Sequence, residues 1–410
     1  MNGITINRQN PLEILLKFFL IYRVIISFIP ASSIYLPMIF NFLTLLIIYV
    51  FLIMLAGIDM ISKTLLRFTP LYLVNILKYC MASKWPSLPV FLYGFLQFSM
   101  WPIVVCYVLN RKQYSYAKLL LGTSITCVLF TSITTVLGNV AFPGASRLLA
   151  AIWSENPALA QYYTSLNIGG FDFVYMLVMF LPLLAPIIQY QDNKVYKLFF
   201  FIFCLLSIFT IIKTEYTTAV ILSLIAPFAI LFPRLLSNKS IFLITLVVLI
   251  CIAPITLLLD NISETVESTV ISERLLNLSN LMQGKAVDGD LESRLELYTI
   301  SLRSFAQNPF WGGSQIGGHS LVFDIVGYFG VIGILILCFI FRQIYMVCIR
   351  PFKGDNSYKY LILVYLIQIL LAVLNTTIIF NVFFFFIPLI GLITHPIHID
   401  NNQKISWGQS

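Results

Sequence analysis

The sequence predicts an all-α fold, a polytopic transmembrane helical bundle. Of its 410 residues, 59% are hydrophobic and 10% are charged, whereas soluble domains carry about 25% charged residues. Most apolar runs are about twenty residues long, the length with which a helix crosses a hydrocarbon core of about 30 Å. None shows the alternating pattern of a membrane barrel. These observations exclude a soluble fold and predict an integral membrane protein built from helices.

About twelve spans are expected along the chain. The apolar runs lie at 14–31, 35–56, 65–81, 87–109, 116–140, 171–190, 196–212, 217–233, 240–259, 321–341, 359–375 and 379–394. The run at 65–81 is the weakest, because Arg67 and Lys78 flank a short stretch that equally suits a helix in the membrane interface. Without it the count is eleven. No linker or repeat marks a boundary, so residues 1–410 are expected to form a single membrane domain.

The basic residues of the short loops predict the orientation. Those loops contain Arg111 and Lys112, Lys194 and Lys197, Arg234 and Lys239, and Arg342, Arg350, Lys353 and Lys359. All fall on one side, which is cytoplasmic by the positive-inside rule. This topology accounts for the net charge of +8 and leaves no reason to expect nucleic acid as a partner. The two long loops, 141–170 and 260–320, then face outward.

The second outer loop is the most polar part of the chain and contains eight of its seventeen acidic residues. Ser293 and Glu296 have the spacing of a capping box, which predicts a helix from about Arg294 to Gln307, ended by Asn308-Pro309. At 100° per residue, Arg294 lies at the border of its apolar face. That face is formed by Leu295, Tyr298, Leu302 and Phe305.

Arg294 also lies at the expected helix start, where free N–H groups favour an anion, although Glu292 and Glu296 oppose one. The following segment contains Gly312, Gly313, Gly317 and Gly318. Glycines allow close backbone approach to a ligand, but the lysine of a phosphate loop is absent. A flexible entry into the next span is the alternative.

His319 is the one histidine expected at this outer interface. A lone histidine is more often structural than catalytic, and it cannot form a zinc site by itself. The seven cysteines contain no CxxC pair, so free thiols are expected and no metal site is predicted. No cofactor is predicted either.

The first outer loop contains one arginine in a helix start. Pro143-Gly144 opens a short helix that contains Arg147, and Asn156-Pro157 opens a second one with a capping residue followed by proline. Arg147 is interpreted either as an anion ligand or as an arginine that snorkels to the membrane surface. Arg23 lies inside the first apolar run, where a charge is costly unless it is paired or faces a cavity. It either lines a path for a lipid phosphate or indicates that the span begins later.

Arginines with a histidine on an outer membrane face suit a substrate that carries a diphosphate at the bilayer surface. Arginine binds such oxygens bidentately and keeps its charge. A histidine with a pKa near neutral accepts a proton from an attacking hydroxyl while the diphosphate leaves. The hypothesis is a metal-independent glycosyl transfer from a lipid diphosphate sugar.

Several motifs carry a family resemblance. They are Ser293–Tyr298, Asn308–Gly312, Ile316–Ser320, Asp324 and Gly327–Gly330 with Gly333. This pattern resembles the C-terminal signature of bacterial O-antigen and capsule repeat-unit polymerases (Wzy-type), which are related to the O-antigen ligases. Gly144–Arg147, Asn167–Gly170 and Tyr175 resemble the first outer arginine loop of that family.

The resemblance implies polymerisation of undecaprenyl-diphosphate-linked oligosaccharide units at the outer, periplasmic face of the cytoplasmic membrane. It implies that Arg147 and Arg294 bind diphosphate and that His319 orients or deprotonates the acceptor hydroxyl. A chain-length regulator and a flippase are implied as partners. The further substrate-binding residues that we expect are Arg303, Arg274, Gly312, Gly313, Gly317, Gly318, Ser320 and Asp324.

Three other functions remain open. An O-antigen ligase shares this architecture but transfers the glycan to a lipid A core. A flippase or transporter would place charges at the membrane midplane, in broken helices or paired halves. A non-catalytic assembly protein is the last alternative. The clustering of polar residues in two outer loops and the His-Ser pair with Asp324 favour the polymerase.

Overall fold

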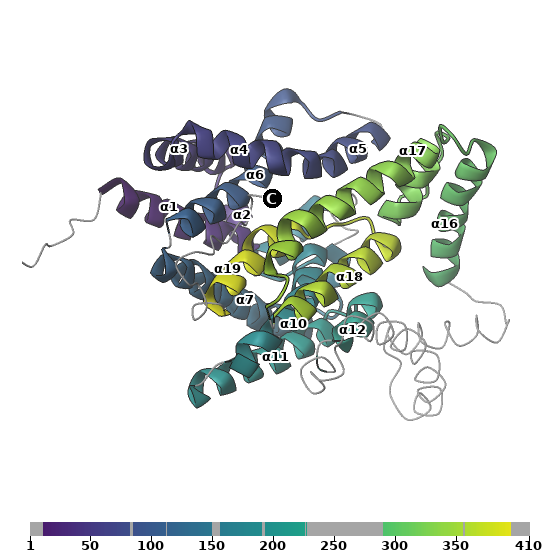
Figure 1. Cartoon of the computed structure of the whole chain (residues 1–410). Coiled ribbons are helices and arrows are strands. Elements are labelled where there is room, and N and C mark those ends of the chain that lie inside the picture. Colours follow the sequence, from purple (N-terminus) through teal and green to yellow (C-terminus); the bar gives the residue numbers. More distant parts are fainter. Residues whose placement is uncertain are drawn as a thin grey trace, which may run out of the picture.

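The structure, a computed structural model, describes residues 11–82, 85–111, 113–149, 156–190, 193–225, 227, 290–355 and 357–394. These residues form helices and connecting turns and contain no β-strand (Figure 1). The all-α prediction is therefore confirmed for the part of the chain described. The predicted span at 240–259, most of the span at 217–233, Arg274, and the loop residues 260–289 lie outside it.

The first half of the chain contributes eleven α-helices to the bundle. They are α1 (Pro11–Phe28), α2 (Ser32–Tyr35), α3 (Met38–Ala56), α4 (Ile58–Phe68), α5 (Leu73–Met81), α6 (Leu88–Asn110), α7 (Tyr114–Ala141), α9 (Pro157–Ser165), α10 (Phe171–Tyr190), α11 (Lys194–Lys213) and α12 (Thr217–Ser223). The second half contributes α16 (Asp290–Gln307), α17 (Leu321–Ile344), α18 (Tyr358–Leu374) and α19 (Ile387–Thr394), with a π-helical segment at Val382–Phe386 before α19.

Six of these helices are long and apolar enough to cross a membrane. They are α3, α6, α7, α10, α11 and the continuous segment from α17 to Phe352. α18 and Val382–Gly391 are apolar but shorter, and α1 carries Glu13, Lys17 and Arg23. The count of twelve spans is therefore not confirmed among the described residues.

The predicted single span at 65–81 is wrong. α4 ends at Phe68, a 3₁₀ turn occupies Thr69–Tyr72, and α5 begins at Leu73. Pro70 lies in this turn, and proline has no N–H to donate and clashes with the carbonyl four residues earlier. Two short helices, rather than one span, therefore occupy this region.

α10 is the central helix of the bundle. Of its span, 83% is buried inside the protein, whereas the neighbouring α11 is only 28% buried. Phe180 of α10 packs against Phe386, whose ring in turn contacts Phe28 of α1, at ring-centroid distances of 4.6 and 5.2 Å. Aromatic rings bury large apolar areas and favour such tilted contacts. This aromatic core joins the two halves of the chain.

α17 contains a break. Gly330 has a φ of 61° and a ψ of −142°, which are not helical values. The amide of Val331, next to the break, donates to the carbonyl of Pro309 at 2.8 Å. α16 lies across the end of α17 in Figure 1, and the turn that joins them packs onto the broken helix. The first half of α17 is thereby tied to α16.

The start of α16 differs from the prediction. The helix already includes Asp290, so Ser293 lies inside it and is not its N-cap. The predicted end at Gln307 before Asn308-Pro309 is confirmed. The predicted cap of the other loop is also confirmed, because the Asn156 side chain accepts a hydrogen bond from the Leu159 amide at 3.2 Å.

Candidate functional site

Arg147 lies in a firmly held helical turn, 145–149, after α7. The Asn139 side chain donates to Ser146 Oγ at 2.7 Å and accepts from the Ser146 amide at 3.2 Å. The Tyr216 hydroxyl donates to the Ser146 carbonyl at 2.7 Å. Burial raises the pKa of Tyr216, so this hydroxyl remains a proton donor, and the nearby Arg147 opposes the shift. Arg147 is half-buried, on a backbone held from two helices.

The connection from α9 to α10 is held against α7 by a polar network. Asn167, at a φ of 58°, donates to Thr131 Oγ1 at 3.1 Å and to Thr134 Oγ1 at 2.9 Å. The Gly169 amide donates to Thr135 Oγ1 at 2.8 Å. These bonds satisfy backbone and side-chain groups that burial would otherwise leave without partners. The first residues of α10 therefore have a defined position.

The loop around His319 is organised by one carboxylate. Asp324 is 4% exposed, and its Oδ1 accepts from Ser301 Oγ at 2.7 Å and from the Gly318 amide at 3.1 Å. Its Oδ2 accepts from the Ser320 amide at 3.3 Å. His319 lies between the two bound amides and its side chain is exposed. The backbone on both sides of His319 is thus held while the imidazole faces outward.

The glycines of this region allow α16, the loop and α17 to pack closely. A Cβ on Gly317 would collide with the Leu297 carbonyl, and one on Gly312 would collide with the Tyr328 carbonyl. A Cβ on Gly327 would lie 2.6 Å from the Ser301 carbonyl. Packing therefore accounts for these glycines, and the prediction that Gly312, Gly313, Gly317 and Gly318 bind substrate stays a prediction.

The buried face of α16 also differs from the prediction. Leu302 is 45% exposed, whereas Ser301 and Ser304 are buried. The predicted stripe that includes Leu302 is therefore wrong as the packing face. Small side chains face α17 because its glycines bring the two backbones together.

The segment 375–381, between α18 and the π-helical segment, connects the His319 loop to the rest of the site. The Leu321 amide donates to the Asn375 carbonyl at 3.0 Å, and the Tyr298 hydroxyl donates to the Leu374 carbonyl at 3.0 Å. The buried Gln368 donates to the Thr377 carbonyl at 3.1 Å and accepts from the Ile379 amide at 2.9 Å. This segment therefore has a defined conformation.

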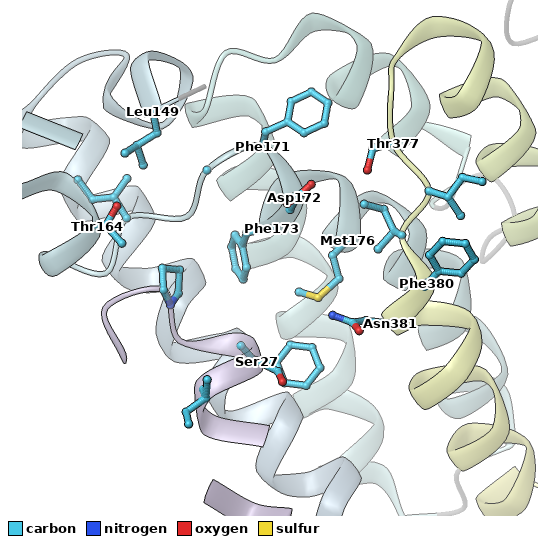
Figure 2. Close-up of a pocket in the computed structure, with 17 residues that line it drawn as sticks. Ser27, Leu149, Thr164, Phe171, Asp172, Phe173, Met176, Thr377, Phe380 and Asn381 are labelled. Atoms are coloured by element: carbon cyan, nitrogen blue, oxygen red, sulfur yellow. The ribbon is translucent and has the colours of Figure 1, made fainter. Parts of the chain in front are cut away.

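A cavity of about 600 Å³ lies on the other side of segment 375–381 (Figure 2). Its walls come from the end of α1, the first outer loop, the start of α10 and residues 377–381. Leu149 lines it and belongs to the same helical turn as Arg147. Arg147 and Asp172 also both interact electrostatically with Tyr216. The cavity thus lies between the two loops that the sequence singled out, and both loops are at one end of the bundle.

The structure places the other predicted site residues unevenly. Arg303 is exposed on α16. Arg294 lies on the same helix, but its side chain is outside the described part, as is the whole of Arg274. Ser320 is buried and its hydroxyl accepts from the Phe323 amide at 3.1 Å, so it caps α17. The structure brings together Gly317, Gly318, Ser320 and Asp324.

Sequence reasoning missed several residues of this region. Asp172 lines the cavity and is the one acidic residue that begins the apolar run 171–190, which is a visible signal. Thr377 and Asn381 also line it, but they come from a segment far along the chain whose position only the fold reveals. Among the described residues, no group of three or more His, Cys, Asp or Glu side chains is arranged to bind a metal ion.

The fold and the site define an integral membrane protein with a polar, glycine-rich region and a cavity at one end of a helical bundle. Residues 200–325, less than half of the chain, match the family model described as O-Antigen ligase. The match confirms the predicted resemblance to this family of membrane glycosyl-transfer enzymes. No curated protein matches the chain.

Proposed function

We propose that the protein joins lipid-diphosphate-linked oligosaccharide units into a polymer at the outer face of the bacterial cytoplasmic membrane. The observation that carries this proposal is the shared position of three features. The loop braced by Asp324 presents His319, segment 375–381 contacts that loop, and the cavity behind this segment adjoins the Arg147 turn. A nucleophile-activating group and an anion-binding group thus flank one space.

The proposed reaction is a single glycosyl transfer. The oxygen of an acceptor sugar hydroxyl forms a bond to the anomeric carbon of the donor, and the bond from that carbon to the diphosphate oxygen breaks. The hydroxyl proton passes to the His319 imidazole. The leaving lipid diphosphate keeps the bonding electrons, and Arg147 and Arg294 balance its charge.

The family match also favours a second function, transfer of a finished glycan to a lipid A core. The two reactions have the same chemistry and differ in the acceptor. The exposed position of His319 is compatible with either acceptor. We place the polymerase first because of the His319-Ser320 pair and Asp324 motif in the sequence.

Gel analysis of surface polysaccharide tests the proposal. Cells that lack the gene are complemented with wild type, His319→Ala, Arg294→Lys or Arg147→Ala, with expression checked. We expect single-repeat glycan in the deletion strain and no ladder from the variants, since lysine cannot replace bidentate arginine contacts. The matched control is Arg111→Lys, because Arg111 donates to the Leu55 carbonyl at the α6–α7 turn.

The other outcomes exclude the polymerase. If full-length polymer accumulates on its lipid carrier but is not attached to the core, the protein is a ligase. If no repeat units reach the outer face, it acts in transport. If all three variants restore a normal ladder, the assigned residues are wrong.

A further inference from the structure

The cavity contains polar groups that the protein itself does not use. Among the described residues, the side chains of Asp172, Thr377 and Asn381 line the cavity and none of them makes a hydrogen bond. In contrast, Thr164 of the same cavity donates to the Ala160 carbonyl at 2.8 Å. Polar groups in protein interiors are usually paired, so unpaired ones that face a cavity indicate a ligand.

These polar groups lie on opposite walls. Asp172 is in the first turn of α10, whereas Thr377 and Asn381 are on the segment that precedes α19, across the cavity in Figure 2. The rings of Phe171, Phe173 and Phe380 lie among them. A ligand in this space would meet aromatic rings and hydrogen-bonding groups from two sides.

The chemistry of the lining discriminates between classes of ligand. A lipid chain would cover the Asp172 carboxylate without giving it a hydrogen bond, and such burial is costly. A phosphate would be repelled by this carboxylate. A neutral polyhydroxyl compound donates to the carboxylate and can exchange hydrogen bonds with Asn381 and Thr377, while its C–H faces pack on the rings. Lys78 of α5 interacts electrostatically with Asp172 and favours its charged form.

We propose that this cavity binds sugar rings of the glycan substrate, with Asp172, Thr377 and Asn381 as their hydrogen-bonding partners. The volume of about 600 Å³ lies within the range of about 300–1,000 Å³ that is typical of small-molecule sites. The inference rests on the proposed glycosyl transfer and extends it, because it assigns recognition of the sugar to residues other than those that bind diphosphate. Asp172 and its partners then determine which repeat unit is accepted.

The test measures binding of sugar without lipid or phosphate. The probe is the oligosaccharide repeat released by mild acid from the surface polysaccharide of the cells that carry the gene. It is titrated into the full-length protein in detergent, and the Kd is measured by calorimetry. We expect Asp172→Asn to raise the Kd at least tenfold and Thr377→Val to raise it severalfold, because each removes hydrogen bonds to sugar hydroxyls at nearly constant volume.

Two controls separate this site from the rest of the protein. Asp59→Asn replaces an exposed carboxylate of α4 that does not line the cavity, and it should leave the Kd unchanged. Arg147→Ala should also leave binding of the phosphate-free probe unchanged, although it abolishes turnover. Unfolding temperatures of all variants identify any that fail to fold.

Equal Kd values for wild type, Asp172→Asn and Thr377→Val would overturn the inference, as would no binding of the probe to wild type. Displacement of the probe by polyprenyl phosphate that is lost with Asp172→Asn would assign the cavity to the lipid and overturn it as well. If the probe binds as expected but gene deletion leaves surface glycan unchanged, the sugar site stands and the proposed function fails.

Discussion

At the scale of single residues, Asp324 shows how the site combines rigidity with access. Its two oxygens accept hydrogen bonds from the amides before and after His319, and from Ser301 of α16. The imidazole itself is exposed. A proton acceptor must lie within hydrogen-bond distance of the hydroxyl that it activates. The carboxylate therefore acts on the reaction through the backbone that carries His319.

Replacement of Asp324 by asparagine should slow transfer. One acceptor oxygen becomes an amide that faces N–H or O–H donors, which costs about 1–3 kcal/mol, and a small displacement of His319 reduces the rate up to about a hundredfold. The measurement is the rate of polymer formation in reconstituted vesicles. Asp355→Asn is the control, since Asp355 accepts from the Ser357 amide at 3.1 Å before α18. A normal rate with a lowered unfolding temperature would limit Asp324 to packing.

Tyr216→Phe should lower the rate severalfold while the protein remains folded. It removes the hydrogen bond to the Ser146 carbonyl, worth about 0.5–1.5 kcal/mol, and loosens the turn that positions Arg147. The same transfer assay is used, with Tyr162→Phe as the matched control, because Tyr162 of α9 is 48% exposed. Identical rates for the two variants would remove Tyr216 from the positioning of Arg147.

At the scale of elements, α16 and α17 form one unit through small residues. Ser301 and Ser304 face glycines of the loop and of α17, and the backbones approach too closely for a Cβ at several of these positions. Such close approach of helices through small residues is common in membrane proteins. The unit presents the His319 loop on a rigid base.

Gly327→Ala tests this packing. The new Cβ would lie 2.6 Å from the Ser301 carbonyl, so α16 must move, and overpacking of this kind costs about 1–3 kcal/mol. We expect a lower unfolding temperature in detergent together with weaker polymer formation. Gly122→Ala is the control, because nothing lies within 4 Å of its Cβ position in α7, and alanine stabilises a helix by up to about 1 kcal/mol. Equal unfolding temperatures for both variants would contradict the packing argument.

The elements themselves were largely predictable. The apolar runs at 87–109, 116–140, 171–190 and 196–212 coincide with α6, α7, α10 and α11 because membrane helices are defined by length and hydropathy. The run at 65–81 failed because hydropathy does not register Pro70. The apolar face of α16 failed because the helical pattern in Leu302 and Phe305 does not reveal that glycines elsewhere select Ser301 as the contact.

At the scale of the whole molecule, the candidate site is assembled from segments far apart in the chain. The end of α1, the start of α10 and residues 377–381 surround one cavity. The sequence predicted the two loops, which carry arginine, histidine and glycine motifs. It did not predict the cavity, since Thr377 and Asn381 have no motif and acquire their position only through the hydrogen bonds of Gln368.

Removal of divalent metal should leave transfer unchanged. In the proposed reaction, the arginines balance the diphosphate charge that a bound magnesium ion balances in many other transferases. The rate in reconstituted vesicles is therefore expected to be the same with and without EDTA. Loss of activity in EDTA that magnesium restores would show that a metal ion participates.

The break at Gly330 has a consequence for how the sequence can change over time. An interrupted helix within a membrane would normally leave N–H groups without partners. Here the Val331 amide is satisfied by Pro309, so the turn after α16 supplies part of the hydrogen bonding of a membrane helix. An insertion or deletion between Asn308 and Gly313 would remove that bond inside the bilayer. Natural length variation is therefore expected before Asp290, whereas the spacing from Pro309 to Val331 should be inherited unchanged.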